Sequence, residues 1–393
     1  MDNNAQIIDC SEGMVSFKSY HQDIVDSSMT VFYNPRMREN RDISIMMISY
    51  LISIKKNKLR LAFPMSATGI RESRLLVECH NNIVEHNNDY GIEILVNDIS
   101  QESLELSRNN INNNNNTNVN ISFNRSDARV FLLSNKHYDY IEIDPYGSPI
   151  PFIDSALQSL KDNSIIGVTA TDTSALCGTY PNATKRKYDA TILLSPMMHE
   201  VSVRVLSSKI IRHAASLGLG AKMLFSYRNE HYIKLFFSIM KGKGRADISL
   251  SNIGNIMICP NCGYMSNKDK CLFCNYNKTL IGPLYTGPLW DNNVLEYANT
   301  FINSYDVFSI RLKKDYATIL SESGLIGLNN VRLDIHRVSS RMRLNSVPGI
   351  DWLKERIVSC KEDFSRSIYG DTIIRTSMKP IILYNILNER SKK

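Results

Sequence analysis

Short β-branched runs alternate with longer amphipathic segments between residues 59 and 240. The short runs have the length and composition of strands, and the longer segments repeat apolar positions at helical spacing. Alternation of strands with helices predicts a mostly parallel sheet that is covered on both faces. The predicted strands are Leu59–Phe63, Ile92–Asn97, Val119–Asn124, Tyr138–Ile143, Ile165–Thr169, Ala221–Ser226 and Tyr232–Ile239.

Amphipathic segments between the earlier strands, and before the last two, are predicted to be helices: Arg71–Asn81, Gln101–Asn110, Ser155–Leu160 and Met198–Leu217. Only a turn-rich stretch at Arg228–His231 separates the last two strands, so we expect the final strand to run antiparallel. Seven strands with a reversed last strand predict a Rossmann-like α/β sheet.

The chain of 393 residues is too long for one ordinary core and predicts two domains. The run Lys241–Arg245 contains two glycines and is predicted to be a linker. We therefore expect one domain over residues 1–240 and an α+β domain over residues 241–393, with helices at Asn292–Ile302 and Asp351–Ser359. The Asn-rich run Asn109–Asn120 is of low complexity and predicts a surface loop.

The positive charge of the chain is concentrated in its C-terminal part. Residues 1–240 hold 24 Lys and Arg against 25 Asp and Glu, whereas residues 241–393 hold 22 against 14. This excess suits contact with a polyanion such as RNA, and the alternative is a solvated basic surface without a ligand. The densest basic stretch is Arg337–Arg343, and Arg332, Lys313 and Lys314 add to it.

The longest mostly apolar stretch, Ile43–Ile54, is about a dozen residues long and is interrupted by serines. It is too short to span a bilayer. No positively charged start with an apolar core precedes it, so no secretory signal is indicated. We expect a cytoplasmic protein that does not associate with membranes and has no obligate protein partner.

Four of the eight cysteines form two close pairs, Cys259 with Cys262 and Cys271 with Cys274. Two Cys-x-x-Cys pairs can present four thiolates to Zn²⁺ in a tetrahedron. Such a closed site leaves no open position for a substrate, so the zinc is expected to be structural. The other four cysteines are scattered, and free buried thiols are the default for them.

Small residues and a glycine follow the first predicted strand at Ser66–Arg71, where a helix begins. Such a turn lets backbone N–H groups approach a ligand at the positive end of the helix. Asp98 ends the second strand, where a carboxylate can bind ribose hydroxyls, and Asp127 follows the third, where it can accept from an adenine amine. Each acid could instead cap a helix. Together they favour an adenosine ligand.

The run Asp144-Pro145-Tyr146-Gly147-Ser148-Pro149 follows the fourth strand. The carboxylate of Asp144 and the carbonyl of Pro145 can accept both hydrogens of an amine on a base, and Asp144 can take up its proton. Proline fixes the backbone that carries this carbonyl. The ring of Tyr146 can stack on a base turned out of its helix. The alternative is a proline-rich turn with an aspartate cap.

These motifs resemble those of the tRNA (guanine-26-N2)-dimethyltransferases, and the likeness covers most of residues 30–280. The motifs that carry it are Val31–Pro35, Asn40–Asp42, Ser66–Arg71, Asn97–Ile99, Asp144–Pro149 and Thr169–Thr173. The resemblance implies a class I methyltransferase fold, with S-adenosylmethionine as the cofactor and tRNA as the partner. It also implies that Asp144 is catalytic and that Phe32 and Tyr146 sandwich the target guanine.

For the cofactor, the resemblance implies contacts from Arg41, Arg71, Asp98, Asp127 and Ala128. Two arginines suit the methionyl carboxylate. Two positions depart from the family pattern. Phe63 stands where the family usually has an aspartate, so one cofactor hydrogen bond is in doubt. Asp-Pro-Tyr replaces Asp-Pro-Phe, which preserves a stacking ring.

Three other functions remain open on sequence grounds. Cys177 could attack the ring of cytosine as the nucleophile of a carbon methyltransferase, although a buried structural cysteine is the favoured interpretation. The chemistry at Asp144 would also suit amine methylation of DNA. Finally, the aromatic residue at Phe63 is compatible with a zinc-containing RNA-binding protein that has lost catalysis.

Overall fold

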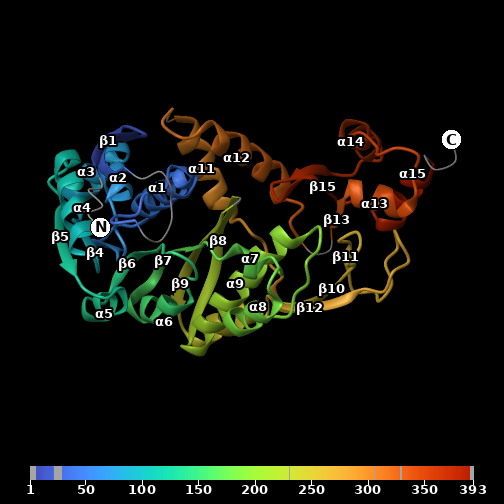
Figure 1. Ribbon diagram of the computed structural model, residues 1–393, viewed down its shortest axis with the longest axis horizontal. Coiled ribbons are helices and arrows are strands. Elements are labelled where there is room, and N and C mark those ends of the chain that lie inside the picture. The colour runs from blue at the N-terminus through green and yellow to red at the C-terminus, as the bar shows by residue number, and fades with distance from the viewer. Residues whose placement is uncertain (1–5, 22–28, 230, 305, 328–329, 390–393) are drawn as a thin grey trace.

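A computed structural model describes residues 6–21, 29–229, 231–304, 306–327 and 330–389. Its centre is a seven-stranded sheet in the order β5-β4-β3-β6-β7-β9-β8 (Figure 1). The strands from β5 to β7 are parallel, and β9 runs antiparallel to both of its neighbours. The predicted α/β class and the reversed last strand are confirmed. The strands are β3 Leu59–Phe63, β4 Ile92–Asp98, β5 Asn120–Arg125, β6 Tyr138–Ile143, β7 Leu160–Ala170, β8 Leu219–Asn229 and β9 Tyr232–Lys241.

Two groups of helices pack around this sheet. In Figure 1, α1, α2 and α3 lie above it and α5 and α6 below it. The helix α1 contacts α2, α3 and α11, whereas α6 contacts α5 and α9. The helices up to α9 are α1 Arg38–Ile54, α2 Ile70–Glu78, α3 His80–Asp89, α4 Gln101–Asn114, α5 Ala128–Ser134, α6 Ile150–Ser159, α7 Thr173–Leu176, α8 Pro181–Tyr188 and α9 Met198–Ser216.

The central strand β6 is buried along its whole length, as a strand covered on both faces must be. Its apolar side chains join those of β3, β4, β7 and β9 in one large core. Because parallel strands end at the same edge of the sheet, the segments that follow β3, β4, β5 and β6 meet there. This edge carries the site described below.

Two loop predictions were wrong in part. The predicted linker Lys241–Arg245 begins α10 (Lys243–Leu250), which packs on β8 because Ala246 and Ser249 are buried. The Asn-rich run continues α4 as far as Asn114. Asn110 in this run is buried, and its side-chain amide donates to the carbonyls of Lys18 (2.9 Å) and Thr68 (2.8 Å). Local composition gave no indication of these tertiary contacts.

Some helices also differ from the predictions. The segment predicted as Arg71–Asn81 divides into α2 and α3 at Cys79. The helix predicted at Ser155–Leu160 is longer, and β7 starts at its end. An unpredicted hairpin of β1 (Ile7–Glu12) and β2 (Val15–Tyr20) packs against α2 and α4, and a 3-10 turn (Pro35–Met37) precedes α1.

The C-terminal part extends to the far end of the long axis (Figure 1). It holds two three-stranded sheets, in the orders β11-β10-β12 and β13-β15-β14. The helices α11 and α12 belong to the large core, and α11 packs on α1, so residues beyond 240 contribute to that core. The elements are β10 Ile253–Ile258, β11 Met265–Ser266, β12 Thr279–Tyr285, α11 Asn292–Ser304, α12 Ile310–Ser323, β13 Val331–Asp334, α13 Ile335–Met342, α14 Ile350–Ser359, β14 Phe364–Ser367, β15 Gly370–Thr376 and α15 Pro380–Asn388.

A buried ion cluster joins α9 to the C-terminal sheet. Glu200 of α9 pairs with Arg204 (2.7 Å), Arg332 (2.6 Å) and Arg375 (2.6 Å), and Arg375 also pairs with Glu322. Arg332 is 1% exposed. The expectation that Arg332 adds to a basic RNA-binding surface is therefore wrong, because its charge is neutralised inside the protein.

Within the part of the chain that the structure describes, no helix is both long enough and apolar enough to cross a membrane.

Candidate active site and metal centre

A cavity of about 1210 Å³ opens at the carboxyl ends of the parallel strands. Ligands of open α/β sheets bind at this edge. All the residues predicted to contact the cofactor or to take part in catalysis line the cavity, and their individual roles remain predictions. They are Phe32, Arg41, Arg71, Asp98, Asp127, Ala128, Asp144, Pro145 and Tyr146.

The turn between β3 and α2 brings the backbone close to Asp98. The carboxylate of Asp98 accepts from the backbone N–H groups of Ala67 (2.9 Å) and Ser100 (3.0 Å). Gly69 adopts φ +70°, and a Cβ at this position would lie 2.9 Å from the Cα of Ser107. A side chain there would push α4 away from the turn. Burial raises the pKa of Asp98 above its ordinary value.

Asp127 caps a helix and also lies at the cavity wall. It is the N-cap of α5, because its carboxylate accepts from the backbone N–H of Arg129 (2.8 Å), and it lines the cavity as well. The Arg129 side chain, which pairs with it at 2.8 Å, lowers the pKa of Asp127 to about 2. Asp127 therefore presents a fixed, ionised acceptor at the cavity wall.

Asp144, at the tip of β6, is part of a buried network of charges. It forms an ion pair with Arg71, whose Nη1 also lies 3.2 Å from Glu142. Lys234 of β9 pairs with Glu142 in turn. Burial raises the pKa of Asp144, but the charges of Arg71 and Lys234 outweigh burial and leave this pKa below its ordinary value. The Asp144 carboxyl is therefore an anion at neutral pH.

Arg41 is held by the N-terminal hairpin. Its Nε and Nη2 donate to the two carboxylate oxygens of Glu12 at 2.7 and 2.5 Å. Burial raises the pKa of Glu12, but Arg41 and Arg74 together lower it to about 2. The result is a bidentate pair, the strongest geometry for a guanidinium and a carboxylate. This pair fixes Arg41 at the edge of the cavity.

Two buried polar atoms at the cavity wall have no hydrogen-bond partner among the described residues. They are the Oγ of Ser66 and the Nε of Arg71. Because an unpaired buried polar group is costly, these atoms indicate a polar ligand. The described wall also holds six acidic residues against three arginines, which favours a ligand that carries positive charge.

Phe32 and Tyr146 meet at the cavity with ring centroids 5.8 Å apart and ring planes at 80°. Two parallel rings that enclose a base are separated by about 7 Å, twice the 3.4 Å stacking distance of nucleic acids. In this form the rings touch edge to face, so a sandwich requires them to separate and turn. Tyr146 is 64% exposed, which leaves it room to do so.

The turn that carries Tyr146 is anchored to the end of β7. The N–H of Gly147 donates to the Oγ1 of Thr171 (2.7 Å), and the N–H of Thr171 donates to the carbonyl of Gly147 (2.9 Å). Gly147 adopts φ +93°, in the region that favours glycine. The backbone around Pro145 is thus fixed, while the ring of Tyr146 remains accessible.

Cys177 does not line the cavity. Its Sγ lies 3.7 Å from the Nδ1 of His199. Burial raises the pKa of the Cys177 thiol, and burial together with Arg228 lowers the pKa of His199 to about 4. Both groups are therefore neutral at pH 7, whereas a nucleophilic cysteine acts as a thiolate. This environment is that of a structural cysteine.

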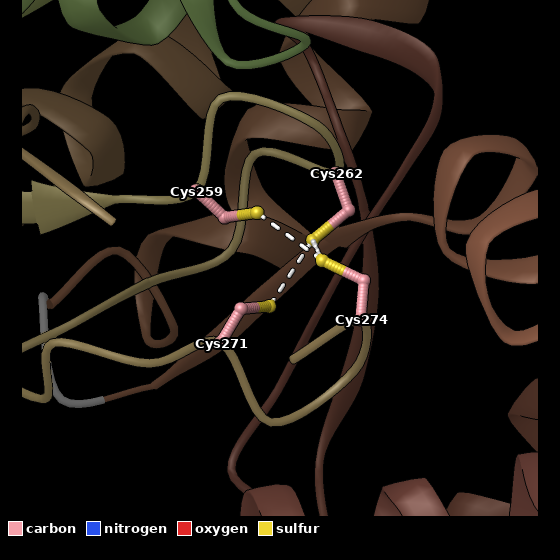
Figure 2. A group of neighbouring side chains, drawn as sticks. All are labelled: Cys259, Cys262, Cys271 and Cys274. Atoms are coloured by element: carbon pink, nitrogen blue, oxygen red, sulfur yellow. Dashed lines mark hydrogen bonds between the residues drawn. The ribbon is translucent and has the colours of Figure 1, made fainter. Parts of the chain in front are cut away.

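The four cysteines of the two Cys-x-x-Cys pairs converge at one point (Figure 2). Their sulfur atoms all lie within 4.8 Å of one another, with Cys259 and Cys274 at 3.4 Å, and Cys262 and Cys271 at 3.4 Å. Four thiolates bound at 2.3 Å in a tetrahedron would have sulfur separations of about 3.8 Å. The donor set and its spacing therefore fit a structural Zn²⁺ ion.

Three arginines of the predicted basic stretch lie on or just after α13, and their side chains are exposed: Arg337, Arg341 and Arg343. They are thus available to phosphates. Lys314 is exposed as well, and Lys313 pairs with Asp306 at 3.2 Å.

The sequence analysis missed several residues that shape the site, above all Glu12, Glu142 and Lys234. For two of them there was a signal. Glu142 and Lys234 are charged residues in buried, mostly apolar strands, and a charge in such a strand must be paired. Glu12 offered no comparable signal, because its strand β1 also contains the polar residues Asp9 and Ser11.

The reversed seven-stranded sheet, with an ionised carboxylate at the tip of β6 and a ligand cavity beside it, defines a Rossmann-like methyltransferase. The chain belongs to the N2,N2-dimethylguanosine tRNA methyltransferase family, whose model matches residues 13–388. The family resemblance seen in the sequence motifs is thereby confirmed.

Individual relatives agree with this family. The tRNA (guanine(26)-N(2)/guanine(27)-N(2))-dimethyltransferase of Aquifex aeolicus is 36% identical over 282 residues, which cover 70% of each chain. The tRNA (guanine(26)-N(2))-dimethyltransferase of Saccharolobus solfataricus is 35% identical and covers 88% of this chain and 87% of its own. The structure of Trm1 from Pyrococcus horikoshii with S-adenosyl-L-methionine has a TM-score of 0.78 at 26% identity, over 98% of this chain and 99% of that chain.

Proposed function

We propose that this chain transfers methyl groups from S-adenosylmethionine to the exocyclic N2 amine of guanosine 26 in tRNA, first one and then a second. The observation that carries the proposal is the ionised Asp144 at the tip of β6, inside a cavity whose wall has unpaired polar atoms. The substrate is inferred from the relatives, whose names state this reaction.

The charges of the cavity wall suit the cofactor. S-adenosylmethionine carries a carboxylate, an ammonium and a sulfonium, and the wall offers arginines for the first and carboxylates for the other two. We assign the methionyl carboxylate to Arg41 and Arg71, whose Nε lacks a protein partner. Asp98 is assigned to the ribose, and Asp127 with the adjacent Ala128 to the adenine. When bound, the cofactor supplies an electrophilic methyl group and leaves as a neutral thioether.

Asp144 and Pro145 hold the target amine. The nitrogen lone pair of a guanine amine is delocalised into the ring, so the amine must be oriented and must lose a proton to react. In this mechanism the carboxylate of Asp144 and the carbonyl of Pro145 accept its two hydrogens. As the N2–methyl bond forms, the proton on N2 becomes strongly acidic and passes to Asp144. Even a carboxylate with a lowered pKa is basic enough for that transfer.

Phe32 and Tyr146 are proposed to enclose the guanine once their rings have separated. A base turned out of its helix loses its stacking partners, and two aromatic rings restore them. The rings would also keep the N2 amine beside Asp144 during the second transfer.

The two parts of the chain are proposed to divide the work. Residues 1–240 bind the cofactor and carry the chemistry, and residues 241–393 bind tRNA through exposed arginines of the Arg337–Arg343 stretch. The four cysteines would bind a structural Zn²⁺ that braces the second part. The two parts differ in their proposed function but are not structurally separate, because α11 of the second part packs on α1 of the first.

Nucleoside mass spectrometry of an unmodified tRNA transcript, incubated with the protein and S-adenosylmethionine, tests the function. We expect N2-methylguanosine and then N2,N2-dimethylguanosine, and neither from a transcript with adenosine at position 26. A lack of methylated guanosine, while the cofactor still binds, would contradict the proposal, and so would 5-methylcytidine. Duplex DNA tested as acceptor should remain unmethylated.

A further inference from the structure

A second carboxyl group lines the cavity and plays no part in the mechanism above. Glu72 lies in the first turn of α2 and is 2% exposed. Acids are common in the first turn of a helix, but they usually face water. Glu72 faces the cavity, and among the described residues no basic side chain lies within ion-pair distance of its carboxyl oxygens.

The charges around Glu72 act in opposite directions, because Arg71 favours its ionised form whereas Glu142 and Asp98 disfavour it, and burial decides the balance. Arg71 precedes it on α2, while Glu142 of β6 and Asp98 of β4 are acids. Burial raises the pKa of Glu72 to about 8, and the two acids add to this effect. In the ligand-free protein the group therefore carries a proton at neutral pH. A buried carboxyl of this kind is poised for a cation that arrives with a ligand.

The turn that leads into α2 lacks an acid at its β3 end. The turn runs from the end of β3 to the start of α2, and its β3 end is Phe63, which also lines the cavity. An aromatic ring there offers no acceptor for a donor group of the cofactor. Glu72 places a carboxyl group in the helix that follows this turn, one position after Arg71.

We propose that Glu72 accepts the ammonium group of the cofactor's methionyl tail, in the place that Phe63 leaves without an acceptor. The assignment rests on the proposed function. The ammonium and carboxylate of that tail share one carbon atom, so the groups that bind them must reach the same part of the cavity, and Glu72 and Arg71 both line it. An ammonium has three N–H donors for a carboxylate, whereas a sulfonium has none.

This assignment predicts release of a proton on binding. An ammonium next to Glu72 favours the ionised carboxylate, so the group loses the proton that it carries in the free protein. Close to one proton should be released at pH 7. Glu72→Gln cannot release it.

Calorimetric titration of the full chain distinguishes the alternatives, with S-adenosylmethionine and two further ligands compared. One is S-adenosylhomocysteine, which retains the ammonium but not the sulfonium charge. The other is the same molecule without its amino group. Glu72→Gln should weaken S-adenosylhomocysteine about tenfold or more and leave the affinity for the deaminated ligand unchanged. Glu85→Gln, an exposed acid on α3 outside the cavity, is the matched control and should bind both ligands as the wild type does.

Titrations of the wild type in buffers of different ionisation enthalpy measure proton release directly, and they decide the matter even if the variant fails to fold. Absence of proton release, or equal affinity of wild type and Glu72→Gln for S-adenosylhomocysteine, would overturn the assignment. Weaker binding of S-adenosylmethionine alone would assign Glu72 to the sulfonium and would overturn it too. If the wild type binds none of these ligands, the proposed function itself fails.

Discussion

Arg71 and Asp144 form an ion pair inside the cavity, so that a residue assigned to the cofactor directly contacts the residue assigned to the acceptor amine. The two residues come from α2 and from the tip of β6. The side chain of Asp144 is 16% exposed and that of Arg71 is 10% exposed. At this burial the arginine charge strongly affects the protonation of the carboxylate.

Removal of that charge should change the pH dependence of methyl transfer. Arg71 lowers the pKa of Asp144, so Arg71→Gln raises it. The reactive form of Asp144 is the anion, whose population falls as the pH falls through this pKa. Single-turnover rates at saturating cofactor should therefore stay level further into the acid range in the wild type than in Arg71→Gln, whose acid limb moves to higher pH.

Arg41→Gln is the control for this experiment. Arg41 pairs with Glu12 and not with Asp144, so its loss should weaken cofactor binding without moving the acid limb. Identical acid limbs in Arg71→Gln and the wild type would show that Arg71 does not set the protonation of Asp144.

Two acids of the site could be found in the sequence because each lies at the end of an apolar, β-branched run. Asp98 and Asp144 could be placed at the carboxyl ends of two strands for this reason, and in the structure these strands, β4 and β6, flank β3 and both acids line one cavity. The sheet was predictable for the same reason, since its strands are buried and their apolar runs are unmistakable.

The pairing of charges was not predictable. Glu12 and Arg41 meet only because an N-terminal hairpin folds against α2, and Arg332 is buried only because α9 places Glu200 beside it. From composition alone, Arg332 was predicted to lie on a basic surface and Lys243 in a linker. Tertiary packing decides both cases, and it leaves no periodic signal in the chain.

Truncation of Tyr146 should slow methylation through the loss of stacking. Base–aromatic stacking contributes about 1–3 kcal/mol per base, so Tyr146→Ala should lower kcat/KM for tRNA roughly 5- to 150-fold. Tyr146→Phe keeps the ring and should stay within about twofold of the wild type. Steady-state methylation assays with both variants provide the measurement. An unaffected Tyr146→Ala would exclude the sandwich.

Cys177→Ala should leave methyl transfer intact. The thiol lies outside the cavity, and burial holds its pKa above the ordinary value. The variant should therefore incorporate methyl groups into tRNA at the wild-type rate, with a small loss of melting temperature from the cavity that the substitution creates. Loss of incorporation in a folded variant would favour a cysteine nucleophile.

The cysteine cluster should hold one zinc ion per chain, measured by inductively coupled plasma mass spectrometry. Cys259→Ser removes one thiolate and should lower both the zinc content and the melting temperature, by roughly 2–4 °C for each kcal/mol lost in a domain of this size. Cys360→Ser, at an exposed cysteine outside the cluster, should change neither. Full stability of a zinc-free protein would contradict a structural role.

The most direct measurement is the single-turnover rate of Asp144→Asn with unmodified tRNA and S-adenosylmethionine, both at saturation. Asparagine keeps the size of the side chain but cannot accept a proton. The rate should fall by about 10²–10⁴, while the dissociation constants for tRNA and the cofactor remain near those of the wild type. A wild-type rate in a folded Asp144→Asn variant would show that the carboxylate at the tip of β6 does not carry the reaction.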